Sequence, residues 1–179
     1  MKVSNKKILL ILSAFAILTF VYFFSFRQWD IKEVIVDYSN KHCQINQECL
    51  VDFKDLTPFS WDRAYIFPDG KNSKSINNAI GMQYRFTDVG LKFIFIRDKE
   101  IVYSEEYFPD LDCHDKNQII PVFATLYPKN NYPSYYFLTK ENSQLFITMR
   151  NSISSNCDMF YEISPSNEDQ SEKSNPYKK

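Results

Sequence analysis

Four residues that could bind a metal ion lie close together in the sequence: Asp110, Asp112, His114 and Asp115. Carboxylate oxygens and imidazole nitrogens are common ligands of divalent cations, so this segment is the candidate metal site. It lacks the glycine and the distal glutamate of an EF-hand loop. Short acidic segments are usually solvated turns. We therefore favour a polar loop beside a disulfide, with metal binding as the alternative.

Catalysis by a nucleophile, or on a bound phosphate, has no motif in this sequence. There is no Gly-x-Ser-x-Gly turn, and the three glycines are too scattered for a phosphate-binding loop. Neighbouring carboxylates such as Glu105 and Glu106 alternate between the two faces of a strand, so this pair cannot converge on one bond by itself. The sequence predicts no catalytic residue and no cofactor.

All four cysteines follow the apolar start of the chain: Cys43, Cys49, Cys113 and Cys157. An even number of cysteines in an oxidising compartment favours two disulfides, and four cysteines allow three pairings. The close spacing of Cys43 and Cys49 would let them close a small loop, which leaves Cys113 to pair with Cys157. There is no Cys-x-x-Cys of a structural zinc site.

A group of tyrosines beside two prolines is the candidate binding surface: Tyr127, Tyr132, Tyr135 and Tyr136. Exposed tyrosines supply rigid contact area at a low entropy cost, which suits a binding surface. Aromatic rings also dominate the cores of many small β domains. We favour the core for these rings and keep the surface as the alternative.

The start of the chain is typical of a membrane anchor. Residues 1–7 contain three lysines and no acid, and residues 8–26 are 19 positions without a charge. A helix of that length is about 28 Å long, close to the thickness of a bilayer's hydrocarbon core. Since basic flanks stay cytoplasmic, we expect a single-pass signal-anchor at 8–26 in a bacterial inner membrane, with the rest periplasmic. The alternative is a signal peptide cleaved near Ala14-Phe15-Ala16.

The exported part of the chain is mildly acidic and rich in aromatic residues. Residues 27–179 carry all 22 acidic residues and 18 of the 21 basic ones, a net charge of −4. This balance argues against nucleic acid as a partner, and the aromatic content of 17% argues against a disordered protein. The expected partners are the membrane, through the single span, and a protein in the envelope.

Alternating apolar residues and turn signals predict a β-rich exported domain over residues 27–163. We expect strands at residues 31–38, 49–53, 61–67, 91–96, 100–107, 118–127, 135–139, 144–149 and 159–163. The segments 91–96 and 100–107 form one predicted hairpin, and 135–139 and 144–149 a second.

The remaining segments complete the predicted architecture. Residues 75–81 have the spacing of a short helix, with Ser75 as its cap and Gly81 at its left-handed end. Residues 164–179 contain no aliphatic side chain, and we expect a disordered tail. The predicted fold class is α+β, predominantly antiparallel β-sheet with one short helix, behind an N-terminal transmembrane helix.

One stretch of the sequence carries a resemblance. Residues 59–67 are Phe-Ser-Trp-Asp-Arg-Ala-Tyr-Ile-Phe, and a short helical segment and the predicted hairpin follow them. This order resembles a pattern of small exported or membrane-anchored bacterial proteins of unknown function, and it covers about residues 53–107. The resemblance implies an envelope location and is silent on activity. The chain departs from it in lacking a lipidation cysteine. We expect Trp61 to pack inside, while Asp62 or Arg63 faces out or pairs locally.

Three functions fit these features. The first is a membrane-anchored periplasmic binding or interaction module, of which an immunity-type protein that blocks an incoming toxin is one version. The second is an envelope hydrolase or metal-dependent enzyme that uses the candidate metal ligands at 110–115. The third is an accessory subunit of a membrane complex. The lack of catalytic motifs favours the first function.

Overall fold

The computed structural model describes residues 29–85, 90–108, 117–121, 134–151, 159–170 and 172–177. The chain divides into two compact units, residues 1–30 and residues 31–179, and the fold below is that of the second unit. The predicted basic flank 1–7 and the predicted span 8–26 lie outside the described residues. No helix within the described part of the chain is long and apolar enough to cross a membrane.

The second unit consists of short strands and helices. In chain order they are α2 (Ile31–His42), β1 (Glu48–Asp52), α3 (Phe53–Leu56), β2 (Arg63–Phe67), α4 (Ser73–Ile80), β3 (Leu91–Arg97), β4 (Glu100–Tyr107), β5 (Asn117–Pro121), β6 (Tyr136–Thr139), β7 (Gln144–Asn151), β8 (Met159–Pro165) and the 3-10 turns η1 (Glu168–Gln170) and η2 (Glu172–Ser174). Strands outnumber helices, so the predicted α+β class is confirmed.

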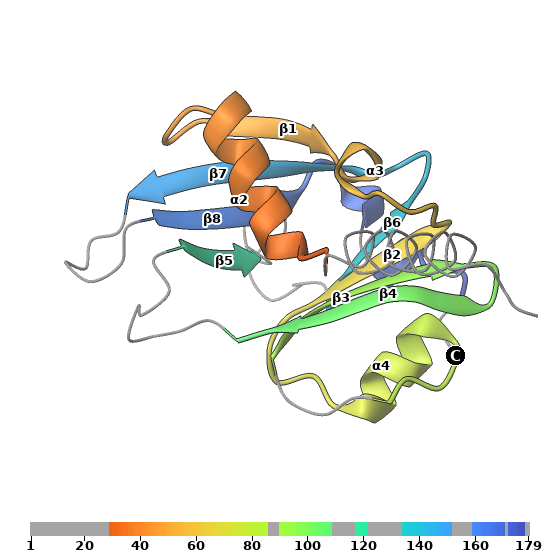
Figure 1. The fold of residues 1–179 in the computed structure, drawn as a ribbon. Coiled ribbons are helices and arrows are strands. Elements are labelled where there is room, and N and C mark those ends of the chain that lie inside the picture. Colours follow the sequence, from red (N-terminus) through yellow and green to blue (C-terminus); the bar gives the residue numbers. More distant parts are fainter. Residues whose placement is uncertain are drawn as a thin grey trace, which may run out of the picture. The chain divides into compact units, whose positions relative to one another are not determined.

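The strands form two sheets (Figure 1). The first sheet has the order β1-β7-β8-β5, and the second has the order β4-β3-β2-β6. All neighbouring pairs are antiparallel except β5 and β8, which run parallel. The predominance of antiparallel pairing is therefore confirmed. β5 lies at the edge of its sheet and ends at Pro121, in agreement with the edge position that a proline in a strand predicts.

The second sheet is buried on both faces in its central strands. All five residues of β2 are buried, as are six of the seven residues of β3. On one face Tyr65, Phe67, Ile94 and Ile96 pack in one cluster with the apolar side of α4. Figure 1 shows α4 against the side of this sheet that faces away from the first sheet. The predicted central position of residues 91–96 is confirmed, since β3 lies between β4 and β2.

Helix α4 confirms the predicted short helix, with one change at its start. Asn72 rather than Ser75 is the cap, because its side chain accepts a hydrogen bond from the Ser75 N–H. Ile76, Ala79 and Ile80 are buried on one side of the helix. Gly81 ends it with a φ of 75°, the left-handed conformation in which glycine meets no steric cost.

Residues 31–38 are helical, and the prediction of a strand there is wrong. Ile31, Ile35 and Ser39 are buried at intervals of four, which is the spacing of a helix face. The Ile31 N–H at the start of α2 donates to the Glu105 carboxylate at 2.9 Å. A negative charge at a helix N-terminus is favourable, and this one comes from 74 residues further along the chain.

The predicted hairpin of residues 135–139 and 144–149 is also wrong. β6 pairs with β2 in the second sheet, whereas β7 pairs with β1 and β8 in the first. The short link between β6 and β7 thus crosses from one sheet to the other. The Phe53 N–H, directly after β1, donates to the Ser143 carbonyl, and Lys140 forms an ion pair with Asp62, directly before β2.

Residues 164–170 and 172–177 carry ordered structure where a disordered tail was expected. β8 continues to Pro165, two 3-10 turns follow, and Gln170 and Asn175 are buried. The Gln170 side-chain amide donates to the carbonyls of Asn142 and Gln144. The expectation failed because it counted aliphatic residues, whereas this segment packs through amide hydrogen bonds to the backbone of the domain.

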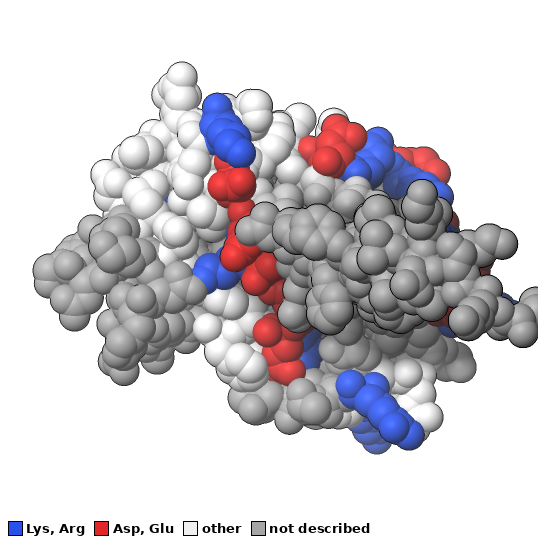
Figure 2. Space-filling view, in the orientation of Figure 1, with Lys and Arg blue, Asp and Glu red and all other residues white. Residues whose placement is uncertain are grey.

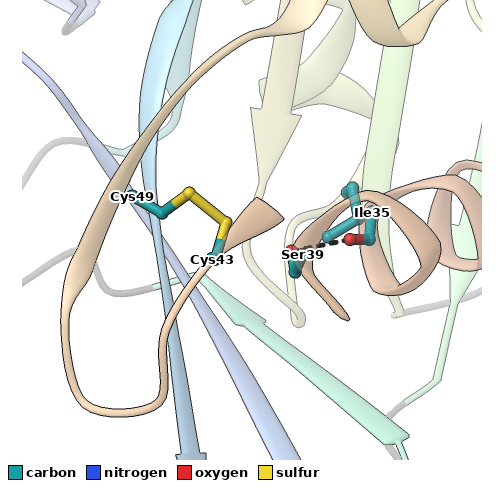
Figure 3. The surroundings of a disulfide bond; sticks show 4 residues. All are labelled: Ile35, Ser39, Cys43 and Cys49. Atoms are coloured by element: carbon teal, nitrogen blue, oxygen red, sulfur yellow. Dashed lines mark hydrogen bonds between the residues drawn. A yellow bond between two sulfur atoms is a disulfide. The ribbon is translucent and has the colours of Figure 1, made fainter. Parts of the chain in front are cut away.

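The expected pair of Cys43 and Cys49 forms a disulfide, with Cα atoms 5.5 Å apart. Cys43 follows the end of α2 and Cys49 lies in β1, so the bond ties this helix to the edge of the first sheet (Figure 3). In the preceding turn of α2 the Ser39 hydroxyl donates to the Ile35 carbonyl. Cys113 and Cys157 lie outside the described residues.

Candidate functional site

A cleft of about 540 Å³ opens at the end of the second sheet that carries the β3–β4 turn. Four segments line it. Arg63 comes from the start of β2, residues 80–82 from the end of α4, Asp98 and Lys99 from the turn, and Pro176 and Tyr177 from the C-terminal segment. The cleft thus combines two cations and one carboxylate with the apolar surfaces of Met82 and Pro176.

Arg63 is the unusual residue of this cleft. Arg63 is the first residue of β2, whose five residues are all buried, and only 7% of Arg63 is exposed. The guanidinium carbon lies 3.8 Å from the centre of the Tyr177 ring, a cation–π contact. Its Nε is buried and has no hydrogen-bond partner among the described residues. A buried N–H donor without a partner carries an uncompensated desolvation cost.

Asp62 positions the turn at the rim of the cleft. Its carboxylate accepts a hydrogen bond of 2.6 Å from the Asp98 N–H and lies 3.1 Å from the Lys140 ammonium. Asp98 takes a φ of 56°, which this contact helps to hold. The Asp98 N–H, followed by Lys140, keeps the pKa of Asp62 below its ordinary value. Asp62 therefore remains an anion that fixes Asp98 and Lys99 at the rim.

Asn175 holds the C-terminal segment against the domain. Its side-chain NH₂ donates to the Ala79 carbonyl at 2.8 Å and to the Tyr135 hydroxyl at 2.7 Å. Its side-chain oxygen accepts from the Tyr177 N–H at 3.0 Å and from the Tyr65 hydroxyl at 3.4 Å. Burial raises the pKa of Tyr65 well above its ordinary value, so this phenol stays protonated and can donate.

Gly81 allows the C-terminal segment to approach α4 closely. A Cβ at this position would lie 3.0 Å from the Tyr177 carbonyl oxygen, and the φ of 75° is one that other residues rarely adopt. The glycine that ends α4 therefore also makes room for the segment that carries Tyr177 over Arg63.

The cleft offers charged groups beside apolar and aromatic surface. Its formal charge is +1, from Arg63 and Lys99 against Asp98, and its remaining walls are apolar or aromatic. Among the residues that the structure describes, no three His, Cys, Asp or Glu side chains are grouped to hold a metal ion. A second hollow, of about 280 Å³, lies over α2 and is lined by Glu33, Val34, Val36 and Asp37. Figure 2 shows acidic side chains gathered over α2.

The candidate metal ligands Asp110, Asp112, His114 and Asp115 lie outside the described residues, as do Tyr127 and Tyr132. Tyr135 and Tyr136 are buried, with 3% and 0% exposed, so these two residues belong to the core and not to a binding surface. The Tyr135 ring packs 5.1 Å from Phe67 and 5.8 Å from Tyr65. β6 is the edge strand beside β2, and Tyr135, directly before it, packs in the same cluster as the apolar side of α4.

The expectation for the Trp-Asp-Arg sequence holds in part. Trp61 is buried and its Nε1 donates to the Thr57 hydroxyl at 2.9 Å. The Asp62 side chain is partly exposed, and it pairs with Lys140 from a distant part of the chain rather than locally. Arg63 neither faces out nor pairs with an acid among the described residues. The signal was present in the sequence, because Arg63 is a charge at the start of a strongly apolar strand. Its aromatic partner, Tyr177, lies more than a hundred positions away and has no such signal.

Comparison of the chain with protein families, with curated proteins and with solved structures finds no match. The resemblance of residues 53–107 to small envelope proteins therefore stays a prediction.

Proposed function

We propose that this protein is a single-pass, membrane-anchored binding module whose folded domain lies outside the cytoplasm of a bacterium, and that the Arg63 cleft is its binding site. The observation that carries the proposal is the buried Arg63 side chain with an unpartnered Nε at the wall of a cleft. The unpartnered donor destabilises the free protein, and a ligand that accepts its hydrogen bond would remove this cost. Local destabilisation of this kind is a property of binding sites.

The anchor part of the proposal is supported by the sequence. Residues 8–26 carry no charge over 19 positions, and Lys2, Lys6 and Lys7 precede them. The Cys43–Cys49 disulfide agrees with an oxidising compartment, because disulfides are rare in the cytosol. An immunity-type role, in which the bound ligand belongs to another protein, is one version of this function.

The location is tested on the full chain with an N-terminal epitope tag, expressed in a bacterium. We expect the protein to stay with the membrane after alkaline carbonate extraction and to be digested by protease added to spheroplasts. The variant Ile11→Lys/Ile17→Lys places two charges in the span, of which the one at its centre, Lys in place of Ile17, costs about 3 kcal/mol, and should be released from the membrane.

A matched control makes the same change at two apolar residues of the domain that are already exposed. Ile45 and Leu50 are 48% and 49% exposed, so Ile45→Lys/Leu50→Lys should leave the protein in the membrane fraction. Wild-type protein that is extracted by carbonate, or that resists protease in spheroplasts but not in lysed cells, would refute the proposed anchor and orientation.

A further inference from the structure

The Arg63 cleft has a charge pattern that selects among ligands. The described residues form several ion pairs, and none of them includes Arg63. The adjacent carboxylate of Asp62 is engaged by the Asp98 N–H and by Lys140. Among the described residues, the guanidinium of Arg63 is contacted by the face of the Tyr177 ring, and the Asp62 carboxylate adds a weaker charge interaction without forming an ion pair. A ligand that supplies an anion would complete this site.

The anion that suits the Arg63 cleft is one with a single negative charge. An arginine fork binds a carboxylate through two parallel hydrogen bonds, and Nε can be one of the two donors. The formal charge of the cleft is +1. α4 also ends at the cleft, with Ile80 and Gly81, so the negative end of its dipole faces the ligand. Asp98 and this helix end both disfavour a phosphate dianion.

The rest of the cleft is suited to an apolar group. Met82 and Pro176 offer aliphatic surface, and the Tyr177 ring offers an aromatic one. A volume of about 540 Å³ lies within the range of sites that enclose small organic molecules. Lys99 is exposed at the rim, where its flexible ammonium can reach the same anion.

We propose that the cleft binds a carboxylate attached to an apolar or aromatic group, with Arg63 holding the carboxylate and Met82 and Tyr177 contacting the apolar part. This inference rests on the proposed binding function and names its ligand class. The carboxylate can come from a free small acid or from the C-terminus of a peptide. Tyr177 covers Arg63, so its ring must shift for the ligand to reach Nε.

The test measures binding to the full chain in detergent micelles by isothermal titration calorimetry. The probes are N-acetyl-L-phenylalanine and its amide, which differ only in the charged group, and a hexapeptide of five alanines and a phenylalanine with a free or an amidated C-terminus. We expect the acid form of at least one pair to bind at least tenfold more tightly than its amide. The tighter of the two acids identifies the source of the carboxylate.

Two variants assign the effect to the cleft. Arg63→Met keeps the apolar stem and removes the charge, and it should fold while losing at least tenfold in affinity for the acid. A structural role for Arg63 would instead lower the melting midpoint of this variant and leave the acid-to-amide ratio of the folded protein unchanged. Lys74→Met is the matched control, because Lys74 is exposed in the first turn of α4, away from the cleft, and should bind like the wild type.

The proposal is overturned if neither acid binds to folded protein, if acid and amide bind equally, or if Arg63→Met binds the acid as well as the wild type does. Each of these results leaves the membrane location untouched, because carbonate extraction and protease access are measured without any ligand. A failure of the ligand class is therefore distinguishable from a failure of the proposed location.

Discussion

Replacing Asn175 with alanine should destabilise the domain far more than its place in a polar C-terminal segment suggests. The substitution removes the four hydrogen bonds of the side chain and leaves the Ala79 carbonyl and the Tyr65 and Tyr135 hydroxyls without this partner. These groups belong to residues that are at most 3% exposed, so water cannot replace the lost bonds without a local opening.

The size of the effect follows from the number and quality of these bonds. A hydrogen bond contributes about 1 kcal/mol net, and a buried group left unpaired costs about 1–3 kcal/mol. The bond from Tyr65 is long, at 3.4 Å, and the Tyr65 and Tyr135 rings lie only 5.8 Å apart, so the two hydroxyls can partly compensate each other. We therefore expect a loss of about 3 kcal/mol, which lowers the melting midpoint by about 6–12 °C for a domain of this size.

The assay is thermal unfolding of the full chain in detergent micelles, followed by circular dichroism. Asn167→Ala is the matched control, because Asn167 is exposed and its side chain bonds mainly to Asn142 on the surface, so the midpoint should move by about 1 °C or less. A chain that ends at Ser174 should melt as low as Asn175→Ala. If Asn175→Ala, the truncated chain and the control all melt like the wild type, the C-terminal segment is not part of the folded domain.

Three further predictions concern other parts of the domain. Replacing both Cys43 and Cys49 with serine opens a loop with a sequence separation of six residues, and the unfolding free energy under non-reducing conditions should fall by about 2 kcal/mol in urea titrations. Lys92 is fully buried and lies 2.9 Å from Glu106, so Lys92→Met should cost about 3–5 kcal/mol in the same titrations, and Lys92→Met/Glu106→Met should recover part of that loss. The pKa of Asp62 is lowered in the folded state, so its carboxylate stabilises the domain above the ordinary pKa of 3.8 and loses this effect as the pH falls through the folded value. Asp62→Asn should therefore melt below the wild type near neutral pH, and the difference should shrink as the pH falls below 3.8. A difference that does not change with pH would contradict the role given to the carboxylate.

Local signals in the sequence were sufficient for much of the second sheet. The alternation of residues 91–96 and the charged turn that follows predict β3 and β4, and the Pro-Asp-Gly turn marks the end of β2. α4 is predicted by three apolar residues with helical spacing and a glycine at the end. In each case the signal lies within the element itself or directly beside it.

The features that were missed depend on residues far apart in the sequence. α2 starts where its first N–H donates to the carboxylate of Glu105 in β4. The link from β6 to β7 crosses between the sheets, and its ends contact Asp62 and Phe53. The cleft brings Arg63 together with Tyr177 only after the C-terminal segment has packed against α4. A rule based on local composition cannot detect contacts between distant residues. It therefore predicted a disordered tail for residues 164–179.

The stability of the C-terminal segment and the binding of a ligand are linked by the geometry of the cleft. Asn175 fixes the backbone two residues before Tyr177, and Tyr177 forms one wall of the cleft and covers Arg63. A ligand that needs this wall binds only the docked state of the segment, and at one hundred times its dissociation constant it stabilises that state by about 2.7 kcal/mol. This is close to the loss expected for Asn175→Ala, so a saturating ligand would offset most of that defect. A ligand that must expel Tyr177 would instead bind Asn175→Ala more tightly than the wild type, and the sign of the change in affinity therefore shows whether the segment acts as a wall or as a lid.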